Sequence, residues 1–146
     1  MSESPFSLAG KVAVVVGGTA GIGRAISLSL AGAGADVVAS GRRQAIVDAV
    51  AAELELKGRA TLRVVSDVCN RNSLEELLQQ TLQKFGKADI LVNCAAKIAR
   101  APTLSFPDEE WEQILDTNLT GTLRACQIFG KLCWSASMVA LLILLR

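Results

Sequence analysis

Residues 16–24 read VGGTAGIGR, and this stretch decides the fold of the chain. It follows Val12–Val16, a continuous apolar run that is typical of a strand buried on both faces. After it, apolar residues recur at helical spacing up to Gly34, where a glycine is expected to stop the helix. The stretch is therefore a glycine-rich turn that joins a buried strand to a helix.

The same alternation of strand and helix continues along the chain. Apolar runs and helical spacing predict strands at 11–16, 36–40, 61–66 and 90–93, and helices at 21–33, 45–57 and 107–129. One more helix is expected to open at the capping-box pattern 73–76, SLEE. Strands separated by helices pair in parallel through right-handed crossovers. We therefore expect an α/β, Rossmann-type doubly wound parallel sheet of strand order 3-2-1-4, to which the apolar run 138–145 could add a fifth strand.

Length and composition exclude several classes of protein. The 146 residues are the size of one domain, so a single NAD(P)-binding domain over 1–146 is expected. The net charge is only +1, which gives no indication of a nucleic-acid partner. The sequence shows neither a leader pattern nor a bilayer-length apolar run, so we expect a cytoplasmic protein with no membrane contact. Four cysteines without a CxxC pair, and no histidine, indicate reduced thiols and no metal site.

The glycines of the turn have a physical use at the end of a strand. In a doubly wound sheet, ligands bind beyond the carboxyl ends of the strands, where the strand order reverses. A helix that starts there offers unpaired N–H groups and partial positive charge to a phosphate. We therefore expect Gly17, Gly21 and Gly23 to be needed for binding a pyrophosphate more than for the fold. The alternative is an ordinary glycine-rich turn.

The same residues resemble the short-chain dehydrogenase/reductase family, whose glycine motif is TGxxxGIG. Residues 16–23 match this motif except that Val16 stands where threonine is usual. Further family motifs follow in the expected order, so the resemblance extends from about residue 7 to about residue 129. It implies a nicotinamide dinucleotide whose binding residues in the turn are Gly17, Thr19, Gly21, Ile22 and Gly23.

Two later motifs imply further contacts with the cofactor. Asp67 and Val68 match the family's residues after the third strand, where the aspartate contacts the adenine. The alternative is a turn-forming aspartate at a strand end. Residues 93–96 read NCAA where the family has NNAG, so Asn93 and Ala95 are expected at the cofactor, with an altered loop beside its ribose.

Asn118, in the stretch DTNLTGT, matches the asparagine of the family's fourth helix. Its spacing places it on the same stripe as Trp111, Ile114 and Leu115, which we expect to pack on the sheet. A buried amide there needs partners for its donors and its acceptor. Two interpretations stay open. The amide bridges backbone groups, or, as the resemblance implies, it is a catalytic residue that positions a proton-relay water beside a lysine.

The end of the second predicted strand bears on the choice of cofactor. An acidic residue there usually holds the ribose hydroxyls of NAD. By resemblance that position is Gly41, and Arg42 and Arg43 follow it. Because an arginine can bind a 2′-phosphate with paired hydrogen bonds, NADP is favoured over NAD. The alternative is that both arginines are only the solvated start of the next helix.

Members of the family transfer a hydride between nicotinamide and a small carbonyl or alcohol substrate. In the family a Tyr acts as the acid/base, a Lys in the pattern YxxxK lowers the pKa of that Tyr, and a Ser orients the substrate oxygen. This sequence contains no tyrosine, and neither Ser135 nor Ser137 is assigned to catalysis, because both precede the apolar run. Residues 130–146 form an atypical apolar tail, and we expect a truncated domain without the usual oligomer interface. Three hypotheses stay open: the cofactor-binding part of an NADP-dependent oxidoreductase, a non-catalytic nucleotide- or partner-binding module, or a non-functional fragment.

Overall fold

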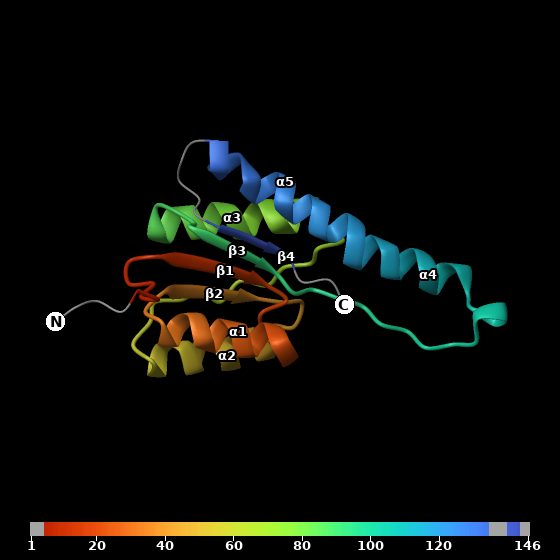
Figure 1. The fold of residues 1–146 in the computed structure, drawn as a ribbon, viewed down its shortest axis with the longest axis horizontal. Coiled ribbons are helices and arrows are strands. Elements are labelled where there is room, and N and C mark those ends of the chain that lie inside the picture. Colours follow the sequence, from red (N-terminus) through yellow and green to blue (C-terminus); the bar gives the residue numbers. More distant parts are fainter. Residues whose placement is uncertain (1–4, 135–139, 144–146) are drawn as a thin grey trace.

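The structure, a computed structural model, describes residues 5–134 and 140–143 (Figure 1). Its elements follow the expected alternation of strand and helix, with a 3-10 turn, η1, and a π-helical turn, η2, near the end. In chain order they are β1 (Val12–Val16), α1 (Gly21–Gly32), β2 (Asp36–Ser40), α2 (Gln44–Leu56), α3 (Arg71–Phe85), β3 (Ile90–Asn93), η1 (Thr103–Ser105), α4 (Asp108–Leu115), η2 (Asp116–Thr120), α5 (Gly121–Trp134) and β4 (Ala140–Ile143).

The sheet is parallel throughout, with strand order β2-β1-β3-β4. Val14 in the middle of β1 pairs with Val38 of β2 on one side and Leu91 of β3 on the other. The predicted doubly wound α/β class is confirmed, and the apolar tail supplies a strand, β4, beside β3. Because all strands are parallel, their carboxyl ends lie along one edge of the sheet (Figure 1).

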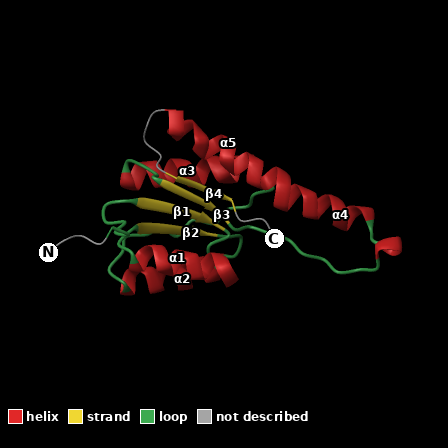
Figure 2. Cartoon of the chain, in the orientation of Figure 1, coloured by secondary structure: helices red, strands yellow, loops and turns green. Residues whose placement is uncertain are grey.

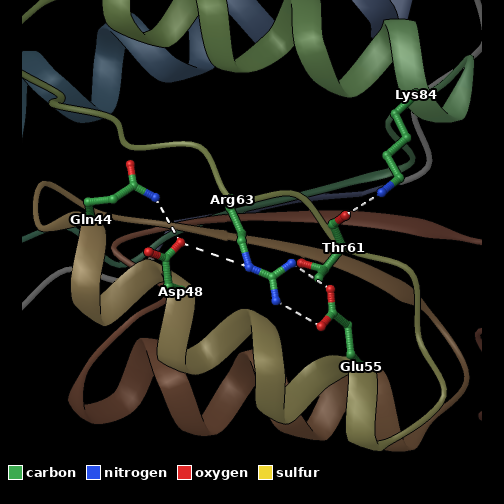
Figure 3. Close-up of polar contacts among 6 residues, drawn as sticks. All are labelled: Gln44, Asp48, Glu55, Thr61, Arg63 and Lys84. Atoms are coloured by element: carbon green, nitrogen blue, oxygen red, sulfur yellow. Dashed lines mark hydrogen bonds and ion pairs between the residues drawn. The ribbon is translucent and has the colours of Figure 1, made fainter.

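The predicted strand at 61–66 is wrong: the structure has no strand there, and the order 3-2-1-4 loses its first member. Backbone bonds tie the segment to β2 only at its ends, from Val37 N to Ala60 O and from Ser66 N to Gly41 O. In between, side chains of the flanking helices take its polar groups (Figure 3). Lys84 of α3 donates to the Thr61 carbonyl, and Arg63 reaches α2. The segment therefore lies beside β2 without forming a ladder.

Two layers of helices cover the sheet, with α1 and α2 on one face and α3 and α5 on the other (Figure 2). Successive residues of β1 point to opposite faces, as the pleat requires. Val15 belongs to the core under α2, with Leu54, whereas Val14 belongs to the core with Leu77 of α3 and Phe129 of α5. All five are buried, and each such burial contributes roughly 1.5–3 kcal/mol.

The predicted capping box of the third helix is also wrong in its register. Helix α3 begins at Arg71, and the side chain of Asn70 caps it by accepting a hydrogen bond from Ser73 N at 3.3 Å. Ser73 therefore lies inside the first turn, where its hydroxyl accepts a bond from Asp67 N instead. An asparagine caps a helix as well as a serine does, and the pattern Asn70-to-Ser73 competes with Ser73-to-Glu76.

The predicted helix 107–129 is a longer run, interrupted by the π-helical turn η2. Of the two α-helices in this run, α5 packs on the sheet, whereas α4 projects beyond the carboxyl ends of the strands (Figure 1). The expectation that the stripe through Trp111 and Leu115 packs on the sheet is therefore wrong, since these side chains are 55% and 38% exposed. Over the described ranges, no helix combines the length and the apolar character that crossing a membrane requires.

Candidate nucleotide-binding site

The turn after β1 is held by close backbone packing. Gly17 has a φ of +79°, which favours glycine, and a Cβ there would stand 2.4 Å from Ala95 N in the loop after β3. A Cβ on Gly23 would stand 2.0 Å from Gly17 O. Both neighbours are backbone atoms of packed elements. The fold therefore requires that both positions lack a side chain, and a greater need for them in phosphate binding stays a prediction.

Gly21 differs from the other two, because it opens α1 with a φ of +51°. The residue before it, Ala20, makes no side-chain cap, and the first turn of α1 contains no acidic residue. The first N–H groups of a helix have no partner within it. The start of α1 therefore offers uncapped donors and positive potential at the carboxyl edge of the sheet.

A groove of about 520 Å³ lies at this helix start and gathers most of the predicted cofactor residues. This volume lies within the range of about 300–1,000 Å³ that is typical of small-molecule sites. Nine predicted residues line it: Gly17, Thr19, Gly21, Gly23, Arg42, Arg43, Asp67, Val68 and Ala95. Two do not. Ile22 is 51% exposed on the far side of its turn, and Asn93 is buried, with its amide nitrogen 3.7 Å from Cys126 Sγ of α5.

The groove also has lining residues that sequence reasoning did not assign to the cofactor. They are Val16, Ala20, Gly41, Ser66, Cys94, Ala96, Lys97 and Thr117. Most of them adjoin a predicted residue, so widening each motif by one position would have found them. Lys97 is different, because only the folded loop after β3 brings it to the groove.

Two arginines give the groove its charge. Arg42 and Arg43 follow β2 at one end of the groove, and both are exposed. Within the described part of the chain neither guanidinium forms an ion pair, whereas Arg24 and Arg63 are paired with carboxylates. An unpaired guanidinium at a groove that includes one carboxylate, Asp67, favours an anionic ligand.

Asp67 both forms a turn and lines the groove. Its Oδ1 accepts a hydrogen bond from Cys69 N at 2.9 Å, and its own N–H donates to Ser73 Oγ at 3.0 Å. The neighbouring Ser66 is tied to the end of β2 by a 2.7 Å bond between its hydroxyl and that of Ser40. The strand-end turn, one of the two interpretations of Asp67, is therefore present, and the residue also lines the groove.

Asn118 bridges backbone groups, which is the first of its two interpretations. Its Oδ1 accepts from Lys97 N at 2.7 Å, and its Nδ2 donates to Lys97 O at 2.9 Å. The side chain of Lys97 in turn reaches Glu110, with Nζ 3.2 Å from a carboxylate oxygen, and Gln113 of α4. The amide of Asn118 thus holds the loop that lines one wall of the groove. Ser135 and Ser137 lie outside the described residues.

Two of the described cysteines outside the groove lining, Cys69 and Cys126, have raised thiol pKa values. Burial raises the pKa of the Cys69 thiol, which lies 3.5 Å from the Thr117 hydroxyl, and burial likewise raises the pKa of Cys126. A raised pKa opposes formation of the nucleophilic thiolate. Among the described residues there is also no cluster of His, Cys, Asp and Glu that could hold a metal ion.

Comparison with known proteins agrees with this geometry. The family model described as short chain dehydrogenase matches residues 11–137, most of the chain. The chain belongs to the short-chain dehydrogenase/reductase family. The resemblance found in the glycine turn is thereby confirmed over residues 11–137.

Individual members of the short-chain dehydrogenase/reductase family match at moderate identity. The 3-oxoacyl-(acyl-carrier-protein) reductase of Synechocystis sp. is 35% identical over 127 residues, 86% of this chain and 51% of that relative. The 2-dehydro-3-deoxy-D-gluconate 5-dehydrogenase of Pseudoalteromonas atlantica is 37% identical over 127 residues, 86% of this chain and 50% of its own. The two names refer to different substrates, so this likeness shows the family and not a substrate.

Solved structures show the same fold. A short-chain type dehydrogenase/reductase from Mycobacterium marinum matches with a TM-score of 0.90 at 29% sequence identity, over 94% of this chain and 56% of that one. The chain spans about half the length of the curated relatives it matches.

Proposed function

We propose that this chain binds NADP(H) in the groove at the start of α1, as the nucleotide-binding part of an oxidoreductase. When bound, the nicotinamide would supply or accept a hydride at the carbon of a carbonyl or alcohol substrate. The residues of this chain bind and orient the cofactor. Gly21 and the helix start receive the pyrophosphate, and Asp67 and Val68 receive the adenine.

The proposed preference for NADP(H) rests on Arg42 and Arg43. Position 41, at the end of β2, is a glycine and presents no carboxylate to the ribose hydroxyls. Arg42 and Arg43 follow directly and line the groove without a protein partner in the described ranges. A guanidinium can hold a phosphate with two parallel hydrogen bonds, which a 2′-hydroxyl cannot exploit. A cofactor with a 2′-phosphate therefore suits this end of the groove better than one without it.

Isothermal titration calorimetry with NADPH and NADH tests this function. The parent chain should bind NADPH more tightly, and Arg42→Ala should weaken NADPH by about ten-fold or more while changing NADH little. Arg100→Ala is the matched control, because Arg100 is exposed and does not line the groove. Equal affinities for the two nucleotides, or an Arg42→Ala chain that keeps its preference, would refute the cofactor assignment. A chain that binds neither nucleotide would refute the function itself.

A further inference from the structure

The two outer strands of the sheet differ in what lies beside them. β2 forms one border of the sheet and β4 the other. The outer side of β2 is occupied by segment 61–66, since Ala60 O accepts a backbone hydrogen bond from β2 and Ser66 N donates to the residue after β2. Arg63 of this segment forms an ion pair with Glu55 of α2. A covered edge that also carries a charged side chain does not accept a further strand.

β4 has a neighbouring strand on one side. Its residues, Ala140–Ile143, pair in parallel with Ile90–Asn93 of β3, one for one. In the part of the chain that the structure describes, no strand pairs with the other side of β4. Every second residue of a strand directs its N–H and C=O groups away from a given neighbour, and at an edge these groups are a template for pairing with another chain. β4 therefore offers the backbone of an edge strand to a partner.

The sequence around β4 contains none of the features by which proteins block an edge strand. Those features are charged side chains, prolines and β-bulges. Residues 132–145 include no charged residue, no proline and no glycine, and the pairing with β3 runs through all of β4 without a bulge. Uncharged apolar segments without proline pair readily with copies of themselves. The edge is therefore suited to a strand of the same kind.

We propose that a second copy of this chain is the partner, and that the two β4 strands pair antiparallel across a two-fold axis. A two-fold axis brings the same residues of both copies together, so the paired surface must be self-complementary. β4 meets this condition because it contains no charge and therefore brings no like charges face to face. The pairing does not depend on the nucleotide.

The covered border at β2 limits this association to two copies. A chain with two open edges adds copies at both borders of its sheet and forms a filament. Here segment 61–66 occupies the border at β2, so each copy has one open edge among its described strands. The expected product is a closed pair with one continuous sheet running through both copies.

A second apolar surface competes for this role, and the experiment separates the two. Trp111, Leu119 and Leu123 lie on the run from α4 to α5, and their side chains are 55%, 63% and 54% exposed. Leu119→Lys places a charge on this surface without changing β4, and it is the control variant. Because Leu119 is exposed, the substitution leaves the core of the chain unchanged.

Sedimentation velocity of the parent should show particles of two chains at about 100 µM and of one chain on dilution. Amide hydrogen exchange in 140–143 should be about ten-fold or more slower in the pair than in the single chain, with exchange in 111–123 unchanged. Leu119→Lys should associate as the parent does. Of Leu141→Pro and Leu142→Pro, one removes an N–H that points away from β3, and that variant should stay a single chain with the circular dichroism of the parent.

The inference is overturned if the parent is a single chain at about 100 µM, or if it forms particles of more than two chains. It is also overturned if association leaves exchange in 140–143 unchanged, if Leu119→Lys abolishes association, or if both proline variants fold and still associate. If neither proline variant folds, as circular dichroism shows, the measurements on the parent and on Leu119→Lys decide. None of these experiments uses a nucleotide, so the proposed function stands or falls separately.

Discussion

The three glycines of the GxxxGxG pattern look alike in the sequence, but the structure gives each a different requirement. Gly17 needs a positive φ and a close contact with the loop after β3. Gly23 needs the absence of a Cβ, since Gly17 O occupies that place. Gly21 needs a positive φ at the first position of α1, beside the groove. The fold therefore requires glycine at two of the three positions through close packing, and at the third through a positive φ at the helix start beside the groove.

Substitution by alanine should separate these roles. Gly23→Ala should lower the free energy of unfolding by about 3 kcal/mol or prevent folding, because the backbone oxygen cannot move aside. Gly21→Ala should cost only about 1–2 kcal/mol through the left-handed φ, keep its helical circular dichroism and bind NADPH more weakly. Urea denaturation and calorimetry measure both quantities.

Gly32→Ala provides the matched control for these two variants. Gly32 is the last residue of α1, and a Cβ there would meet nothing within 4 Å. This variant should be as stable as the parent or more stable, by up to about 1 kcal/mol, with unchanged NADPH affinity. If Gly23→Ala proves as stable as Gly32→Ala, the packing account of Gly23 fails. If Gly21→Ala binds NADPH as well as the parent, the turn does not receive the phosphate.

At the scale of helices and strands, the predictions succeeded where one residue pattern acts alone. The valine-rich run predicted at 11–16 forms β1 (Val12–Val16), and the apolar runs at 36–40 and 90–93 form strands with the predicted bounds. Segment 61–66 is also rich in apolar and β-branched residues, but only part of it is buried and it forms no ladder. Its hydrogen bonds to Glu55 of α2 and Lys84 of α3 involve residues outside the segment, which no local pattern contains.

The start of α3 tests the corrected cap. Asn70→Ala should lower the free energy of unfolding by about 1 kcal/mol, because it leaves the Ser73 N–H without its acceptor. Ser73→Ala should leave the helix start in place and act on the Asp67 turn instead, through the lost bond to Asp67 N. Urea denaturation compares the two, with NADPH binding as the second readout. A larger loss of stability for Ser73→Ala than for Asn70→Ala would support the capping box that the sequence predicted.

Arg63 anchors segment 61–66 to α2, and its removal should loosen that segment alone (Figure 3). Arg63 donates to both carboxylate oxygens of Glu55, at 2.6 and 2.8 Å, and lies 3.9 Å from Asp48. Arg63→Met should speed amide hydrogen exchange over 61–66 at neutral pH, whereas Lys57→Met, on an exposed residue outside this cluster, should not. Unchanged exchange in Arg63→Met would show that the two backbone hydrogen bonds to β2 are enough to hold the segment in place.

The same anchor should depend on pH in a definite direction. The hydrogen bond from Arg63 lowers the pKa of Glu55 below its ordinary value. A lowered carboxyl pKa means that the contribution is present at neutral pH and lost as the pH falls through the folded-state pKa. The difference in exchange between Arg63→Met and the parent should therefore shrink on acidification below about pH 4. A difference that stays constant over that range would exclude the ion pair as its cause.

At the scale of the whole molecule, the candidate site depends on the parallel sheet. Four segments that are far apart in the sequence meet at the carboxyl ends of the strands. They are the turn at Gly17, the end of β2 at Arg42, the turn at Asp67 and the loop at Ala95. The alternation of strands and helices predicts that a ligand site lies at the carboxyl ends of the strands. For this reason, nine of the predicted cofactor residues line one groove. Ile22 and Asn93 fall outside it because side-chain direction depends on packing: Ile22 faces outward from α1, and the amide of Asn93 lies against α5.

The 146-residue chain should bind nucleotide without turning it over. The proposed binding uses the groove and the uncapped helix start, whereas the sequence contains no tyrosine to act as the acid/base that the family resemblance implies. NADPH at a hundred times its dissociation constant should raise the free energy of unfolding by about 2.7 kcal/mol, measured by urea denaturation. In the same sample, NADPH absorbance should fall no faster than in a blank when small ketones and aldehydes are added. Turnover that survives repurification, and falls with Arg42→Ala, would show that another residue of this chain replaces the tyrosine.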